Sequence, residues 1–125
     1  MRETRNCVVF GRGNADADIA FVAEAPGRDE DLYGEPFKGD TGKFFENELL
    51  SLAGLSRNEV YITNACKCRP IDAKGDNRRP CAQEYAACKP ILLKELEIVD
   101  PKLVVLLGAI PLKSLLGHER RVRHP

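Results

Sequence analysis

Three side chains in this sequence have chemistry to offer where predicted strands end or loops begin. Glu24 follows an apolar segment and precedes Pro26-Gly27, so its carboxylate can polarise a water molecule or stabilise a developing cation. Phe37 lies among glycine and proline residues, and an aromatic ring in such a loop can support a flat ligand. Asn64 ends Val60–Thr63, and its amide offers a donor and an acceptor in one plane, which suits a base edge.

Each of these side chains also has a purely structural interpretation. Glu24 can be a capping carboxylate, Phe37 can anchor its loop to the core, and Asn64 can be an ordinary turn residue. The residue types alone leave both interpretations open.

The cysteines are a second set of reactive groups. The chain has five of them, at positions 7, 66, 68, 81 and 88. An odd number without a secretion signal argues against a disulfide framework. Cys66-Lys67-Cys68 is shorter than a Cys-x-x-Cys pair, and no zinc-finger spacing is present. A metal, an iron–sulfur cluster and buried thiols all remain open.

Apolar runs and chain breakers predict the elements that must position these residues. Strands are predicted at Cys7–Phe10, Ile19–Ala23, Val60–Thr63 and Leu103–Leu107, and helices at Lys43–Ala53, Cys81–Val99 and Pro111–Leu116. In the first helix, Phe45, Leu49 and Leu52 share the expected buried face. The connecting turn and loops are predicted at Gly11–Asn14, Arg28–Gly42 and Ile71–Arg79.

This alternation of strands and helices predicts an α/β fold with a mostly parallel sheet. The three apolar strands, Ile19–Ala23, Val60–Thr63 and Leu103–Leu107, are expected at its centre because parallel strands are buried on both faces. Ligands of such sheets bind beyond the carboxyl ends of the strands. Glu24 and Asn64 are both expected at that edge.

Composition sets wider limits. The 125 residues are 43% hydrophobic and 30% charged, which excludes a disordered chain, a collagen and a coiled coil. No apolar run approaches the roughly 20 residues of a membrane helix, and the N-terminus lacks a signal peptide, so a cytoplasmic protein is expected. Residues 1–60 carry 12 acidic and 7 basic side chains, and residues 61–125 carry the reverse. A basic half of this kind is compatible with binding a polyanion.

Taken in order, the motifs of this chain resemble the uracil-DNA glycosylase superfamily, and most closely its family-4 iron–sulfur enzymes. The resemblance covers nearly the whole chain. It is carried by Val8–Asn14, Glu24–Asp31, Gly34–Phe37 with Gly39 and Gly42, Val60–Asn64, Lys67–Pro70, Asn77-Arg78 with Pro80, Ala87-Cys88 with Pro90, Pro101-Lys102 and Leu107-Gly108.

The resemblance implies a three-layer α/β/α fold and a monomer that acts on uracil-containing DNA. Such enzymes flip uracil out of the base stack and hydrolyse its N-glycosidic bond. The implied roles are catalysis by Glu24, lining of the uracil pocket by Ala23 and Ala25, stacking by Phe37, reading of the base edge by Asn64, and ligation of a [4Fe–4S] cluster by Cys68 and Cys88.

Departures from the family pattern qualify these expectations. The family's upstream Cys-x-x-Cys pair is absent, so two of the four cluster ligands are missing, and Ala23 replaces a glycine. His124-Pro125 repeats the dipeptide of the family's histidine loop without the strand that precedes it, and we interpret it as coincidental. We therefore expect one domain over residues 1–125, incomplete at both ends. A DNA-binding remnant without activity and a relative acting on another base are the alternatives.

Overall fold

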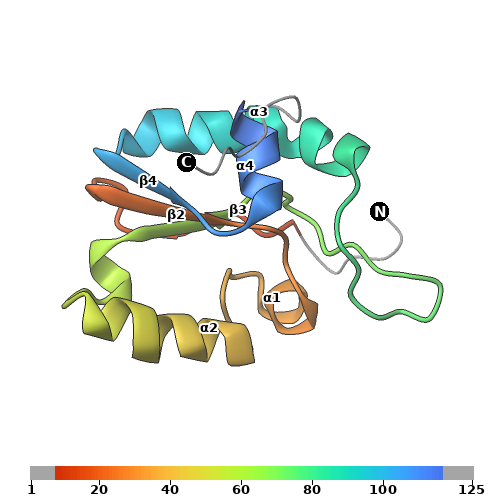
Figure 1. Cartoon of the computed structure of the whole chain (residues 1–125), viewed down its shortest axis with the longest axis horizontal. Helices are drawn as coiled ribbons and strands as arrows, with labels where there is room; N and C mark the ends of the chain where they lie inside the picture. Colours follow the sequence, from red (N-terminus) through yellow and green to blue (C-terminus); the bar gives the residue numbers. More distant parts are fainter. Residues whose placement is uncertain (1–7, 117–125) are drawn as a thin grey trace, which may run out of the picture.

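The computed structural model describes residues 8–116, which form a four-stranded sheet between two layers of helices (Figure 1). Helices α3 and α4 cover one face of the sheet, and α1 and α2 cover the other. The elements are β1 (Arg12–Gly13), β2 (Ile19–Ala23), α1 (Arg28–Tyr33), α2 (Asp40–Phe44), the π-helical η2 (Phe45–Leu50), the 3₁₀-helical η3 (Arg57–Glu59), β3 (Tyr61–Asn64), α3 (Ala82–Val99), β4 (Leu103–Leu106) and α4 (Ala109–Leu116). The predicted three-layer α/β class is confirmed. Cys7 and His124-Pro125 lie outside the described residues.

The sheet has the strand order β1-β3-β2-β4. Strand β2 is parallel to both β3 and β4, whereas β1 is antiparallel to β3. Ala23 pairs with Asn64, and Val22 pairs with Leu106, so the carboxyl ends of three strands meet at one edge. Among the described residues β4 is an edge strand, with Leu103 54% exposed. The expectation that Leu103–Leu107 lies at the centre is therefore wrong for this part of the sheet.

The first short strand lies where a turn was expected. Val8–Phe10 contains no strand, and Arg12–Gly13 within the predicted turn pairs with β3 instead. Gly13 has a φ of 126°, and a Cβ on it would lie 2.0 Å from the Val60 carbonyl oxygen. Only glycine permits this approach, which a periodicity argument does not detect.

The predicted loop Arg28–Gly42 contains a helix, α1, at its start. Glu30 Oε1 accepts from the N–H of the N-cap residue Gly27 at 2.8 Å, and Gly34 ends the helix with a φ of 73°. Acidic residues in the first turn and a glycine just after the last turn are local helix signals. The sequence contains these signals, but the glycine and proline residues of the segment favoured the prediction of a loop.

The helix after this loop has a different buried face from the predicted one. Phe45 is buried, but Leu49 and Leu52 are 45% and 84% exposed, and Leu50 is buried instead. Segment η2 is a π-helix, in which hydrogen bonds span five residues rather than four. Phe45 and Leu50 are five residues apart, so the wider turn brings both to the core.

Helix α3 follows its prediction closely, from its N-cap Cys81 through Pro90 to Val99. Helix α4 begins at Ala109, two residues before the predicted start at Pro111. No helix in residues 8–116 is long and apolar enough to cross a lipid bilayer.

Candidate functional site

A cavity of about 470 Å³ opens at the carboxyl edge of the sheet. All five residues expected at a uracil pocket line it, namely Ala23, Glu24, Ala25, Phe37 and Asn64. They come from the end of β2, the loop before α2 and the end of β3. Three segments that are distant in sequence therefore meet around one cavity.

The pairing of β2 with β3 explains why Glu24 and Asn64 meet. The ladder continues beyond both strands, because the Ala65 N–H donates to the Ala23 carbonyl at 2.8 Å and the Cys66 N–H donates to the Glu24 carbonyl at 3.0 Å. Asn64, which is 4% exposed, follows the alternation of β3 and shares a face with Ile62. That face is the one covered by η2.

The Glu24 carboxylate remains accessible at the mouth of this cavity. Its side chain is 36% exposed, and its nearest ion-pair partner is the Arg79 guanidinium, with Nε 3.7 Å from Oε1. An exposed pair at that distance contributes little stability. The carboxylate is consequently available to a ligand or a water molecule.

Phe37 is held as a rigid aromatic platform. Its ring stacks on Phe45 with centroids 4.6 Å apart and an interplanar angle of 14°, and Phe45 meets Phe21 edge-on at 5.0 Å. Phe37 has a φ of 53°, a left-handed conformation that costs a non-glycine residue about 1–3 kcal/mol. The Arg57 guanidinium holds this backbone by donating to the Pro36 carbonyl at 3.0 Å and to the Phe37 carbonyl.

Glu30 also lines the cavity, and the sequence analysis did not single it out. Its Oε1 accepts from the Gly27 N–H at 2.8 Å, while Oε2 accepts from the N–H groups of Lys38 and Gly39 at 2.8 and 2.9 Å. One carboxylate thus joins the loop after β2 to the loop that carries Phe37. Its position three residues after Gly27 was the available signal.

A second hollow of about 460 Å³ lies beside the first, and Asn77 lines both. Its basic lining residues are Arg28, Arg69 and Lys74. The predicted loop Ile71–Arg79 forms its wall, and Arg69 Nε donates to Asn77 Oδ1 at 2.8 Å. Asn77 therefore connects a basic surface to the candidate site.

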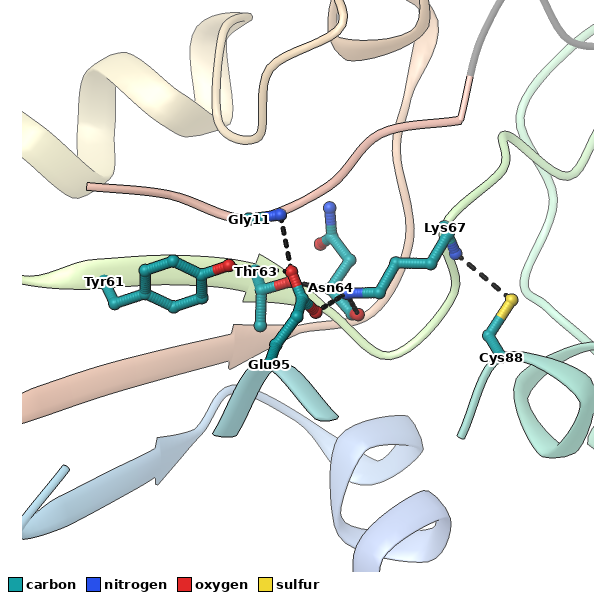
Figure 2. A network of polar contacts seen from close by, with 7 residues as sticks. All are labelled: Gly11, Tyr61, Thr63, Asn64, Lys67, Cys88 and Glu95. Atoms are coloured by element: carbon teal, nitrogen blue, oxygen red, sulfur yellow. Dashed lines mark hydrogen bonds and ion pairs between the residues drawn. The ribbon is translucent and has the colours of Figure 1, made fainter. Parts of the chain in front are cut away.

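The opposite face of β3 carries a buried polar network (Figure 2). The Lys67 ammonium group donates to Glu95 Oε1, Thr63 Oγ1 and the Asn64 carbonyl, the last at 2.8 Å. The other Glu95 oxygen accepts from the Tyr61 hydroxyl at 2.8 Å. Burial lowers the pKa of Lys67, while burial and the Glu95 contact raise the pKa of Tyr61. Neither Lys67 nor Glu95 was singled out, because a charge in a sequence carries no sign of burial.

The cysteines meet in a way that the spacing did not predict. The Cys88 thiol accepts from the Lys67 N–H at 3.3 Å. The Cys66 thiol also donates to Cys88 and lowers the pKa of Cys88 to about 6, whereas the same bond and burial raise the pKa of Cys66. Cys68, which follows Cys66 and Lys67 in the sequence, is also buried. Within residues 8–116 no three His, Cys, Asp or Glu side chains are arranged to hold a metal, so the described residues do not by themselves supply the four ligands of an iron–sulfur cluster.

Comparison with known proteins gives the chain its relatives. A sequence profile described as the Uracil DNA glycosylase superfamily matches residues 10–124. The chain is 47% identical to the type-4 uracil-DNA glycosylase of Archaeoglobus fulgidus over 86% of its own length and 52% of that protein. It is 46% identical to the type-4 uracil-DNA glycosylase of Thermotoga maritima, over 93% and 58% of the two chains. A type-5 uracil-DNA glycosylase of Pyrobaculum aerophilum is 32% identical. The chain spans about half the length of the curated relatives it matches.

Proposed function

The chain belongs to the uracil-DNA glycosylase superfamily, and from that premise we propose that it removes uracil from DNA by hydrolysing the N-glycosidic bond. One observation carries the proposal. Glu24, Phe37 and Asn64 line a single cavity of about 470 Å³, within the roughly 300–1,000 Å³ usual for small-molecule pockets. A carboxylate, an aromatic face and an amide are the three groups that base recognition and bond cleavage need.

Uracil enters this cavity as a flipped base. The face of Phe37 opposite Phe45 stacks on the pyrimidine, and the Phe45 contact at 4.6 Å keeps the platform in place. The Asn64 amide pairs with uracil through its carbonyl oxygen to N3–H and through its NH₂ group to O4. Cytosine presents the reverse pattern at these positions, so the same amide discriminates against it.

Glu24 supplies the charge that the reaction needs. As the N-glycosidic bond breaks, the sugar acquires oxocarbenium character, and a nearby carboxylate stabilises that positive charge. The same carboxylate can orient the attacking water and accept its proton. Its exposure of 36% at the cavity mouth is compatible with access for both sugar and water.

The neighbouring basic hollow suits the DNA backbone. Arg28, Arg69 and Lys74, together with the single acidic residue Asp76, line about 460 Å³ of space next to the uracil cavity. Such side chains bind phosphates without reading sequence and make the affinity depend on salt. We expect binding of single-stranded DNA to weaken steeply as the salt concentration rises.

For the cofactor we propose that Cys68 and Cys88 are two of the four ligands of a family-type [4Fe–4S] cluster. A cluster needs about four thiolates, and the described residues do not assemble that set. No step of the mechanism above therefore uses it. Iron analysis of protein purified without oxygen is expected to give far fewer than about four irons per chain. A full complement of iron, with the brown absorbance of the cluster, would show that other cysteines complete the site.

Uracil release from a single-stranded oligonucleotide tests the function. We expect abasic sites after incubation with the uracil-containing strand and none with strands carrying hypoxanthine or xanthine. Glu24→Gln should reduce the rate about 100-fold, the size of a general acid–base contribution. Glu97→Gln is the matched control, because that carboxylate lies on α3 and is 73% exposed. Absence of both uracil release and uracil binding would refute the proposal, and release of another base would redirect it.

A further inference from the structure

We propose that Lys67 is a positioning residue for uracil recognition. Its buried ammonium group fixes the Asn64 peptide, and thereby the direction of the Asn64 amide. The inference rests on the proposed function, since Asn64 is the residue proposed to read the base.

The contacts of Lys67 leave its ammonium group a single orientation. An ammonium group has three donors, and three acceptors surround this one: Glu95 Oε1, Thr63 Oγ1 and the Asn64 carbonyl oxygen. The side chain is 1% exposed. Lys67 is therefore out of reach of any substrate in the cavity, and its effect on recognition must pass through Asn64.

Glu95 is in turn held from three sides. Its Oε1 accepts from the Thr63 hydroxyl at 2.8 Å, and its Oε2 accepts from the Tyr61 hydroxyl at 2.8 Å and the Gly11 N–H at 2.7 Å. These donors come from β3 and from the segment before β1. The carboxylate that orients Lys67 is thus itself fixed to the sheet.

Helix α3 also contacts the backbone of Lys67. Cys88 accepts from the Lys67 N–H at 3.3 Å, so α3 contacts residue 67 through both its side chain and its main chain. Figure 2 shows the Asn64 amide directed away from the Lys67 ammonium group, while the Asn64 carbonyl faces it. Fixing the carbonyl on one side of the strand sets the amide on the other side, where it lines the cavity.

Stability alone does not account for this arrangement. A buried ion pair replaced by apolar side chains of similar volume often leaves a protein equally or more stable. What apolar side chains cannot supply is a donor for the Asn64 carbonyl. This difference separates a positioning role from a structural one and defines the experiment.

The test compares Lys67→Met with the double variant Lys67→Met/Glu95→Leu, using the full ¹⁵N-labelled chain. Lys67→Met alone leaves a buried carboxylate without its partner and is expected to unfold at a lower temperature. The double variant removes both charges and should regain most of the wild-type midpoint of thermal unfolding. Lys102→Met is the matched control, since that lysine is 83% exposed.

Two readouts are recorded, the binding of free uracil and the side-chain NH₂ signals of Asn64, which are assigned by their loss in Asn64→Asp. We expect the double variant to bind uracil about 10-fold more weakly, the loss of one well-oriented base contact. Its Asn64 NH₂ signals should move toward those of a mobile amide. Wild-type binding and unchanged Asn64 signals in a stable double variant would overturn the proposal.

The two proposals fail in different ways. If the wild-type chain neither releases nor binds uracil, the proposed function fails, and the Asn64 NH₂ signals alone then decide the positioning role. If the wild-type chain binds uracil and the double variant binds it equally well, the function stands and Lys67 is only structural.

Discussion

The two faces of strand β3 differ in what they contact: one borders a cavity and the other a buried polar network. On the face toward η2, Ile62 packs against Phe45 and Asn64 borders an open cavity. On the face toward α3, Tyr61 and Thr63 donate to a buried Glu95. This strand of four residues thus separates an open cavity from a network whose polar groups are hydrogen-bonded to one another.

Under the proposed function, recognition and positioning are divided between the two faces. A group that reads a ligand must leave its hydrogen-bonding atoms accessible, and so it cannot also be held through those atoms. Asn64 resolves this conflict by being held through its carbonyl, which accepts from Lys67 at 2.8 Å. Phe37 is likewise held through its carbonyl, by Arg57, while its ring faces the cavity.

The largest expected effect is on the buried face. Glu95→Leu leaves the Lys67 ammonium group buried without a carboxylate, so we expect the free energy of unfolding to fall by about 3–5 kcal/mol. Denaturant titration measures the change. Glu97→Leu on the exposed side of α3 should alter it by less than about 0.5 kcal/mol. A loss below about 1 kcal/mol for Glu95→Leu would mean that the polar contacts on the buried face of β3 contribute no more to the free energy of unfolding than those on the cavity face.

The cavity face should respond in ligand binding rather than in stability. Phe37→Ala removes the stacking platform, so the affinity for free uracil should fall by an amount worth about 1–3 kcal/mol. An NMR titration with uracil measures it. Phe10→Ala, which truncates an aromatic ring that is 53% exposed, serves as the control. Equal affinities for the two variants would exclude Phe37 as the platform.

Base choice should change when the reading amide is altered. Asn64→Asp replaces an NH₂ donor with an acceptor, which repels uracil O4 and accepts from the cytosine amino group. We expect the preference for uracil over cytosine to fall about 10-fold, or about 1.4 kcal/mol. Asn58→Asp on η3 is the matched control. A preference that stays the same in Asn64→Asp would remove this residue from the recognition step.

The smallest effect concerns a polar contact at the start of α3 that lies nearer the surface. The Glu84 carboxylate accepts from Nη1 and Nη2 of Arg78 at 2.5 and 2.8 Å and from the Cys81 N–H at 2.9 Å. The Arg78 contact, with help from Cys81, lowers the pKa of Glu84 to about 2. The ionised Glu84 carboxylate therefore stabilises the folded state fully above its ordinary pKa of 4.5, and this stabilisation is lost as the pH falls toward 2.

Glu84→Gln should accordingly cost about 1 kcal/mol at neutral pH, the usual value of a helix cap. Unfolding experiments at pH 7 and near pH 2 measure the difference from the wild-type chain, most of which should be lost at the lower pH. A difference of the same size at both values would show that charge has no part in this cap. Together with Glu95→Leu, this result compares a partly exposed ion pair with a buried one.

Much of the scaffold could be predicted because its signals are local. Ile19–Ala23 is an apolar run between polar turns, and the structure has β2 over the same residues. Helix α3 was predicted to within one residue of its observed start. The errors occurred where local signals conflict, as in Arg28–Gly42, or where hydrogen bonding departs from the α-helical period, as in η2.

The cavity residues were predicted partly from chemistry and partly from family resemblance. Glu24, Phe37 and Asn64 follow strands or interrupt loops in ways that a sequence displays, and the structure brings them to one cavity. Glu30 was missed because its three bonds go to backbone N–H groups, which every sequence contains. A carboxylate bound in this way leaves no partner residue type to search for.

The sequence by itself determined the class of fold, the positions of β2 and α3 along the chain and the candidate residues that line the cavity, because apolar runs, breakers and motifs are properties of neighbouring residues. Only the tertiary structure decided which charges are buried and which thiols meet. Lys67 and Glu95 are 28 residues apart, and the Cys66 thiol, which no motif singled out, donates to Cys88. Burial of a charge depends on the partner that long-range packing brings to it, and no local pattern records that partner.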